Sequence, residues 1–243
     1  MLSSEALIIP DWPAPPNVKA LQTTRMGGIS LAPYHSLNLG AHVQDDALAV
    51  AQNRQLLRSY LPSEPVWLNQ VHGIDVIDAA SGAGLPAADA SYSLAKNIVC
   101  VTMTADCLPV LLCHQQGMAV AAIHAGWRSL CDGVIEATIQ SLGFQAHELM
   151  AWLGPAIGPQ AFEVGSEVRA AFIAQDAQAA LAFQASGDKW LADLYGIARQ
   201  RLHQQGITKI YGGGECTFSN PSQYFSFRRD GVTGRMATMI WFE

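Results

Sequence analysis

The chain has 243 residues, of which 50% are hydrophobic and 14% are charged, and its net charge is −6. This composition allows a large buried core and excludes a disordered chain. It also argues against broad binding to nucleic acid, which needs a basic surface.

The N-terminal residues do not resemble a targeting signal. They carry no basic region, and the apolar run over 6–10 is too short for a signal peptide. No stretch approaches the roughly 20 apolar residues of a membrane span. We therefore expect a cytoplasmic protein that does not associate with a membrane.

The five cysteines do not suggest a disulfide framework. Their number is odd, no C-x-x-C pair occurs, and a chain of this size can build its own core. Most should be buried as small hydrophobic side chains, which leaves room for one with a chemical role.

The first third of the chain predicts a strand, a helix and a sharp bend. The elements are a strand over 18–25, a helix over 47–61 with Asp46 as N-cap, and two apolar runs over 66–71 and 74–77. The two runs meet at His72-Gly73, which predicts a hairpin or a tight bend there.

The middle of the chain predicts central strands followed by a long helix. Apolar runs over 98–104, 108–113 and 118–123 are nearly continuous, as in strands that are covered on both faces. The segment 127–142 then has apolar residues at helical spacing.

The last third predicts further strands and helices around a loop rich in glycine and proline. They are strands over 149–153, 208–211, 223–228 and 236–242, the loop 154–160, and helices over 166–175 and 188–204, the last with Asp188 as N-cap. Helices and strands are interleaved, but two hairpins break a strict βαβ rhythm. We therefore predict a single α+β domain over 1–243 with mixed β-sheets.

Several familiar enzyme signatures are absent from the sequence. It lacks the P-loop, the dinucleotide-binding G-x-G-x-x-G, the nucleophile elbow G-x-S-x-G and the zinc motif H-E-x-x-H. The pattern of zinc deaminases is also missing. No H-x-H pair occurs, so the clustered histidines of a multicopper oxidase are not present.

One cysteine and two histidines are placed where a metal site could form. Cys107 interrupts two apolar runs, and His124 ends a third. If the strands over 98–104 and 118–123 are neighbours, both side chains emerge at one sheet edge, and His72 could join them from its bend. A thiolate and two imidazoles suit zinc and leave a fourth position open. From spacing alone, a buried cysteine and two hydrogen-bonded histidines fit at least as well.

Ten of the fourteen basic residues are arginines, the side chain best suited to bidentate binding of oxyanions. Arg25 precedes a Gly-Gly turn, Arg128 opens a predicted helix whose N-terminus also favours an anion, and Arg228 ends an aromatic segment. Each is a candidate for substrate binding, and each could also be an ordinary surface arginine.

Two further polar residues are candidates with a structural alternative. Asn38 lies in a loop where it could contact substrate or cap a turn. Asp106 could orient a ligand histidine or stabilise a local turn.

Seven ordered motifs closely resemble the YfiH family, also called the laccase-domain or peptidoglycan-editing-factor family. They are Thr24–Gly28, Ser36–Gly40, Gln70–Gly73, Thr104–Pro109, His124–Arg128, Leu153–Gly158 and Tyr224–Arg229. The resemblance runs from about Ile8 to the C-terminus, and the sequence does not depart from the family pattern at the metal positions.

The resemblance implies a metal site and a fold. The family's histidine in Q-V-H-G, cysteine in A-D-C-L-P and histidine in H-A-G-W-R bind zinc, and these correspond to His72, Cys107 and His124. The family fold is an α+β sandwich of the α/β/β/α type, with mixed sheets between helices.

The resemblance also implies purine nucleosides and phosphate as substrates. Family members look like purine nucleoside phosphorylases that act on adenosine, inosine and methylthioadenosine and that deaminate adenosine. On this reading His72, Cys107 and His124 form the catalytic zinc site, and one or more of the three arginines balance the phosphate charge. Asp106 would then fix a histidine tautomer, and Asn38 would contact substrate.

Other functions remain open at this point. A metal-free cysteine hydrolase acting in peptidoglycan editing would use Cys107 as nucleophile and His124 or His72 as base. A copper-dependent polyphenol oxidase would use the same ligands, but one three-ligand site cannot supply the four-copper relay of a laccase. A non-enzymatic sensor would bind a small molecule without turnover.

Overall fold

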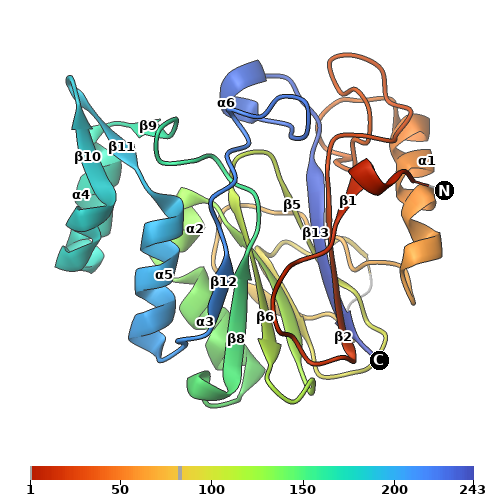
Figure 1. The fold of residues 1–243 in the computed structure, drawn as a ribbon, viewed down its shortest axis with the longest axis horizontal. Coiled ribbons are helices and arrows are strands. Elements are labelled where there is room, and N and C mark those ends of the chain that lie inside the picture. The colour runs from red at the N-terminus through yellow and green to blue at the C-terminus, as the bar shows by residue number, and fades with distance from the viewer. Residues whose placement is uncertain (1, 82–83) are drawn as a thin grey trace.

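Two β-sheets pack face to face at the centre of the molecule, and helices cover their outer faces (Figure 1). The computed structural model describes residues 2–81 and 84–243. The first sheet is antiparallel, with the strand order β1-β2-β13-β5. Its strands are β1 (Leu7–Ile8), β2 (Val18–Thr23), β13 (Met236–Phe242) and β5 (Cys100–Thr104).

The second sheet is mixed and has the order β12-β8-β6-β7-β4-β3. Its strands are β12 (Ile210–Gly212), β8 (Leu149–Leu153), β6 (Leu108–His114), β7 (Val120–Ala125), β4 (Ala90–Ser93) and β3 (Val76–Asp78). The outermost pairs, β12 with β8 and β3 with β4, are parallel, and the inner pairs are antiparallel. Every residue of β6 and β7 is buried, which explains why their sequences read as continuous apolar runs.

Three apolar layers hold the sandwich together. Side chains such as Leu111, Val120 and Ile240 fill the space between the two sheets. The helix α1 (Ala47–Leu57) lies beside the outer face of the first sheet. The outer face of the second sheet is covered by α2 (Trp127–Asp132), α3 (Val134–Leu142) and α5 (Leu194–Gln205). The order helix, sheet, sheet, helix confirms the predicted α+β sandwich.

A smaller unit projects from the side of the second sheet (Figure 1). It contains the sheet β10-β11-β9 and the helix α4, with β9 at Glu163–Val164, α4 at Ser166–Gln175, β10 at Phe183–Ser186 and β11 at Lys189–Ala192. Short 3-10 segments lie at Ser4–Ala6, Arg58–Tyr60, Ala146–Glu148 and Ala177–Ala182, and the one-turn helix α6 spans Phe227–Asp230.

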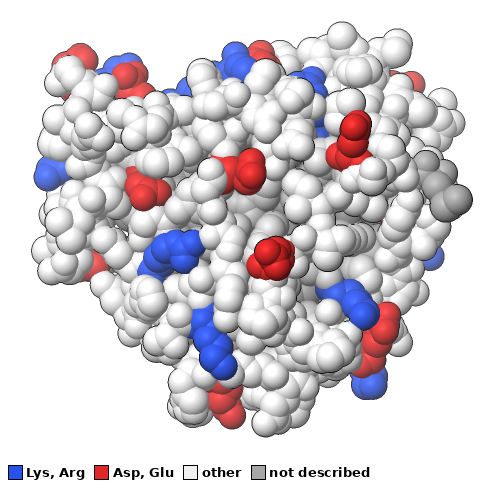
Figure 2. Space-filling view, viewed as in Figure 1, with Lys and Arg blue, Asp and Glu red and all other residues white. Residues whose placement is uncertain are grey.

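The surface is mixed in charge. On the face shown in Figure 2, acidic and basic side chains are interspersed in a largely uncharged surface. Within the described part of the chain, no helix combines the length and apolarity that crossing a bilayer requires.

Of the two forms predicted around His72-Gly73, the hairpin is wrong and the sharp bend is confirmed. Among the described residues, its two arms do not pair with each other: Val66 forms a bridge to Cys100 of the first sheet, whereas β3 pairs with β4 of the second. The segment therefore crosses from one sheet to the other. It bends sharply at His72, whose φ is +60°.

Two predicted helices have different limits in the structure. The helix over 127–142 is divided into α2 and α3 by Gly133, whose φ of +103° ends the first helix. The helix over 188–204 begins only at Leu194, because Asp188 belongs to a two-residue Gly-Asp turn between β10 and β11.

The strand predicted over 223–228 is also wrong, since its last two residues begin α6. By contrast, the strands over 98–104, 108–113, 149–153 and 236–242 are confirmed to within a few residues. Asp46 caps α1 as predicted, accepting a hydrogen bond from the Leu48 amide at 3.0 Å.

Candidate metal centre

His72, Cys107 and His124 converge on one point. Their ligand atoms all lie within 4.8 Å of one another, and Cys107 Sγ is 3.9 Å from His72 Nε2. The two imidazole rings meet edge to face, with centroids 4.8 Å apart. Across residues 2–81 and 84–243, this is the one group of three or more His, Cys, Asp or Glu side chains that is close enough to hold a metal.

The β6–β7 hairpin brings Cys107 beside His124. Its register sets Pro109 opposite His124 and Leu108 opposite Ala125, so Cys107, the residue before β6, reaches the end of β7. The convergence predicted from the sequence is therefore present, but the reason given for it is wrong. The strand over 98–104 is β5, which belongs to the other sheet.

Asp89, a residue that the sequence did not single out, positions both histidines. Its carboxylate is fully buried and accepts hydrogen bonds from the amides of Val71, His72 and Gly73 at 3.1, 3.0 and 2.7 Å. Its Oδ1 also lies 2.7 Å from His124 Nδ1. One carboxylate thus fixes the bend that carries His72 and leaves Nε2 of His124 free for a metal.

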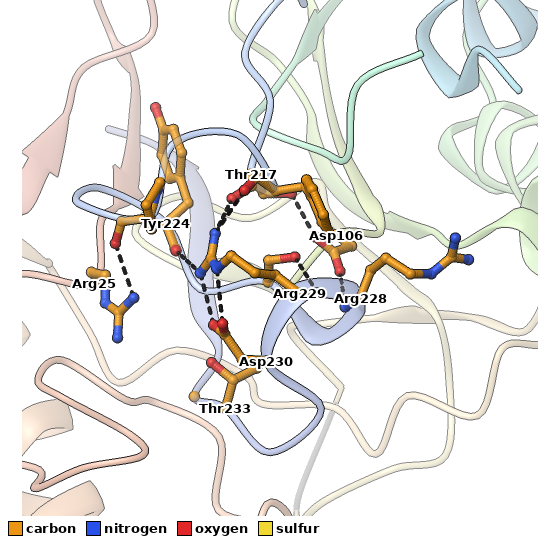
Figure 3. Close-up of polar contacts among 12 residues, drawn as sticks. Arg25, Asp106, Thr217, Tyr224, Arg228, Arg229, Asp230 and Thr233 are labelled. Carbon is orange, nitrogen blue, oxygen red and sulfur yellow. Dashed lines mark hydrogen bonds and ion pairs between the residues drawn. The ribbon is translucent and has the colours of Figure 1, made fainter. Parts of the chain in front are cut away.

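The role predicted for Asp106 therefore belongs to Asp89. Figure 3 shows the Asp106 carboxylate bonded elsewhere: it accepts from Thr217 Oγ1 and from the Arg228 amide, both at 2.6 Å. Asp106 has a φ of +95° and precedes Cys107 directly. It ties the turn that carries the thiol to the C-terminal segment of the chain.

The electrostatic environment favours the ligating form of the cysteine. Burial raises the pKa of Cys107, but the charge of His124 and hydrogen bonds with His124 and His72 outweigh it and lower that pKa to about 6. Burial likewise lowers the pKa of His124, but Cys107 and Asp89 raise it to about 9. The thiolate is the form of cysteine that binds metals, whereas His124 has to lose its proton before it can coordinate one.

The space between the ligands depends on Gly126. A Cβ atom at this position would lie 2.8 Å from His72 Cδ2 and 3.2 Å from Cys107 Sγ. The glycine therefore keeps the ligands at their present separation. A thiolate and two imidazoles form a donor set that fits zinc and leaves one coordination position open.

We expect Gly126→Ala to lower the affinity for zinc by about tenfold or more, within the range seen when ligand-supporting groups are lost. The φ of Gly126 is −62°, so alanine fits the backbone and the effect arises from contact with the ligands. Chelator competition measures it. Gly73→Ala is the matched control, because its Cβ would make only ordinary contacts of 3.6 and 3.7 Å. Equal zinc affinity in both variants would contradict this account.

A cavity of about 400 Å³ opens over the three ligands. The other lining residues are His42, Gln70, Met103, Thr104, Ala105, Arg128, Phe227 and Arg235, and none of these described residues is acidic. Neither arginine forms an ion pair within the described part of the chain. The Arg128 guanidinium lies 4.4 Å from the centre of the Trp127 ring, and the Arg235 guanidinium donates to the backbone carbonyls of Thr233 and Gly234. The cavity is therefore suited to an anion.

Two of the three arginines singled out in the sequence lie outside the cavity lining. Arg25 donates to the carbonyls of His35 and Pro221, and Arg228 donates to the carbonyl of Glu163. Their positions do not support the substrate contacts predicted for them. Of the three arginines predicted to bind substrate, only Arg128 lines the cavity.

Asn38 is fully buried and bonded within the protein. Its Oδ1 accepts from the amides of Gly40 and Arg235, and its Nδ2 donates to Asp45 Oδ2 at 2.9 Å. Its position does not support direct contact with substrate. Instead, Asn38 anchors the backbone of Arg235, a cavity residue that the sequence analysis missed because nothing in its local pattern marks it.

Comparison with known proteins gives full-length matches. The family model described as multi-copper polyphenol oxidoreductase laccase matches residues 19–243. "Purine nucleoside phosphorylase YfiH" of Shigella flexneri is 54% identical over 238 residues, which cover 97% of this chain and 98% of that protein. "Purine nucleoside phosphorylase PA4543" of Pseudomonas aeruginosa is 52% identical over 240 residues, covering 98% and 99%.

Solved structures show the same fold. The Neisseria meningitidis protein NMB0706 superimposes with a TM-score of 0.95 at 48% identity, covering 98% of this chain and 99% of that one. YlmD of Geobacillus stearothermophilus superimposes with a TM-score of 0.89 at 26% identity, covering 100% and 98%. Identity above half along nearly the whole chain, together with this shared fold, establishes that the chain belongs to the YfiH family.

Proposed function

We propose that this protein is a zinc-dependent purine nucleoside phosphorylase that acts on adenosine, inosine and methylthioadenosine. Relatives that match along the whole chain are named purine nucleoside phosphorylases. The main support for the proposal is one cavity. It is lined both by the three candidate metal ligands and by two arginines, Arg128 and Arg235, that have no acidic partner among the described residues.

The two arginines would bind the phosphate. In phosphorolysis a phosphate oxygen attacks the anomeric carbon of the ribose, and the bond to the purine nitrogen breaks with its electron pair going to the base. Arg128 and Arg235 can donate charge-assisted hydrogen bonds that hold the nucleophile in line with that bond. Arg235 is partly buried, so its charge acts through a weaker dielectric than bulk water.

Another cavity residue is available to bind substrate. The Thr104 hydroxyl is buried and has no hydrogen-bond partner among the described residues, although the residue lines the cavity. Gln70, by contrast, uses its amide nitrogen and oxygen on the backbone of Met103 at 2.8 and 2.7 Å. We assign Thr104 to substrate binding. We assign Gln70 to holding the segment that carries His72 against β5.

Zinc bound by these ligands would supply a Lewis acid with one open position, suited to a phosphate oxygen in phosphorolysis or to a water molecule in adenosine deamination. We therefore include adenosine deamination as a second activity of the same site. Release of ammonia from adenosine, with inosine as product, measures it independently of phosphate.

The test is turnover of inosine and adenosine with and without phosphate. We expect free purine base and ribose 1-phosphate only when phosphate is present. Release of base without phosphate would indicate a nucleoside hydrolase. No release under either condition would overturn the proposal.

Two alternatives use the same residues. A metal-free cysteine hydrolase predicts that Cys107 is alkylated equally before and after chelation, whereas a zinc site predicts protection before chelation only. A laccase needs several copper sites, but the described residues bring together one three-ligand group. We therefore favour the phosphorylase over both.

We expect Arg128→Ala and Arg235→Ala each to raise the KM for phosphate by roughly 10- to 150-fold, because a hydrogen bond to a charged group contributes about 1.5–3 kcal/mol. Steady-state kinetics at saturating nucleoside measures this. Arg228→Ala is the control, since its guanidinium donates to the carbonyl of Glu163 outside the cavity. If all three variants keep the wild-type KM for phosphate, the arginine assignment is wrong.

A further inference from the structure

Phe227 is a large aromatic side chain that the fold leaves exposed beside the metal site. It is the first residue of α6 and is 57% exposed. It lines the metal cavity and also a smaller adjoining cavity of about 190 Å³. Phe227, His42 and Arg235 are common to both cavities, so they form the boundary between them.

Hydrogen bonds hold the backbone next to Phe227, and the guanidinium of Arg235 lies over its ring, 5.8 Å from the ring centroid. The Asp106 carboxylate accepts from the amide of Arg228, the next residue, and the buried Ser226 hydroxyl accepts from the Arg229 amide at 3.2 Å. These bonds fix the residues on either side of the ring. The backbone that carries the ring is therefore fixed in position. The stability of the fold would not require this for an exposed hydrophobic side chain.

Arg229 anchors the rest of the same segment. Its guanidinium donates to the carbonyls of Thr217, Phe218 and Tyr224 at 2.8, 3.1 and 2.9 Å, and it pairs with Asp230 at 2.7 Å. These contacts tie α6 to the segment that precedes it. This arrangement gives a function to the Arg-Arg motif, which does not reach the cavity itself.

The smaller cavity differs in chemistry from the metal cavity. Apart from the three boundary residues, its lining is Val43, Gln44, Gly231, Val232 and Thr233. The Thr233 side chain is 2% exposed, and its hydroxyl has no hydrogen-bond partner among the described residues. An aromatic ring, apolar side chains and an unpaired hydroxyl suit a flat heterocycle with polar edges.

We infer that Phe227 is the stacking platform for the purine base, and that the smaller cavity receives the base while the arginines face the phosphate. This inference rests on the proposed function and adds the binding site of the base to it. Stacking engages the face of any purine, since every base has a π-face. A site built on it accepts adenine and hypoxanthine alike, which accounts for a substrate range that includes adenosine and inosine.

The experiment compares Phe227→Ala with the wild type in two measurements. Stacking of a base on an aromatic side chain is worth about 1–3 kcal/mol, so the KM for inosine should rise roughly 5- to 150-fold. The affinity for hypoxanthine alone, measured by calorimetry without phosphate, should fall by a similar factor. The zinc content should stay at the wild-type value.

Three further variants make the result specific. Phe227→Tyr keeps the aromatic face and should keep the wild-type KM for inosine, whereas Phe227→Leu keeps an apolar side chain and should behave like alanine. Leu48→Ala removes another exposed hydrophobic side chain, 73% exposed on α1, and should have no effect.

The outcomes separate this inference from the proposed function. If the wild type cleaves inosine with phosphate and Phe227→Ala or Phe227→Leu retains both affinities, the stacking role is wrong and the phosphorylase stands. If the wild type shows no phosphate-dependent turnover but binds hypoxanthine through Phe227, the base site stands and the phosphorylase is wrong. A wild type that binds no hypoxanthine overturns the base site.

Discussion

Replacing Cys107 by alanine is expected to remove zinc from the protein and to abolish phosphate-dependent cleavage of nucleosides. The thiolate is one of the three proposed ligands, so its loss should cost more than the roughly 100-fold in metal affinity that loss of a supporting residue can cause. Zinc content by elemental analysis and turnover of inosine measure the two effects. Zinc content and turnover should be lost together, because the proposed zinc site is also the proposed active site.

Cys216→Ala provides the matched control for this substitution. Cys107 and Cys216 are the two partly exposed cysteines among the five, and Cys216 accepts a hydrogen bond from the Gly158 amide outside the metal cavity. The control should keep zinc and turnover. Retention of one zinc per chain and full turnover in Cys107→Ala would refute the ligand assignment.

Asp89→Asn is expected to lower zinc affinity by about 10- to 100-fold, because it disturbs the positions of two ligands at once. The carboxylate of Asp89 faces three backbone amides and His124 Nδ1, all of them hydrogen-bond donors when the carboxylate is charged. The amide nitrogen of asparagine is itself a donor, so it cannot accept hydrogen bonds from these groups. Each buried amide left without an acceptor costs about 1–3 kcal/mol of unfolding free energy.

Two measurements test this prediction: chelator competition for zinc affinity and denaturant unfolding for stability. The control is Asp46→Asn, in which asparagine can keep the cap on α1. We expect the control to match the wild type in both. An Asp89→Asn protein with wild-type zinc affinity would show that the histidines hold their positions without the carboxylate.

Much of the fold was predictable because the core strands carry strong local signals. The strands β5, β6, β8 and β13 are continuous apolar runs, and these runs are buried on both faces of the central sheets. The elements that were missed depend on single residues. Gly133 divides one helix, and the Gly187-Asp188 turn replaces the start of another by a hairpin.

The three residues of the candidate metal site were predictable from motifs, but the residues that support them were not. His72, Cys107 and His124 are marked by residue type and by resemblance to a family. Asp89 acts through hydrogen bonds to residues 16 to 35 positions away in the chain, and Arg235 is held by Asn38 across 197 positions. A local sequence pattern carries no information about contacts at such separations.

The same limit explains why the wrong carboxylate was chosen. Asp106 is adjacent to Cys107 in sequence, so it was the natural candidate to orient a ligand. In the structure the Asp106 carboxylate bonds to Thr217, whereas Asp89 reaches His124 from the position just before β4.

X-ray absorption at the zinc edge of the purified wild-type protein tests the account most directly. We expect one sulfur neighbour at about 2.3 Å and two imidazole nitrogens at about 2.0–2.1 Å, with one lighter atom completing a tetrahedral shell. A spectrum without a sulfur neighbour, or a protein that cannot take up one zinc per chain, would contradict it.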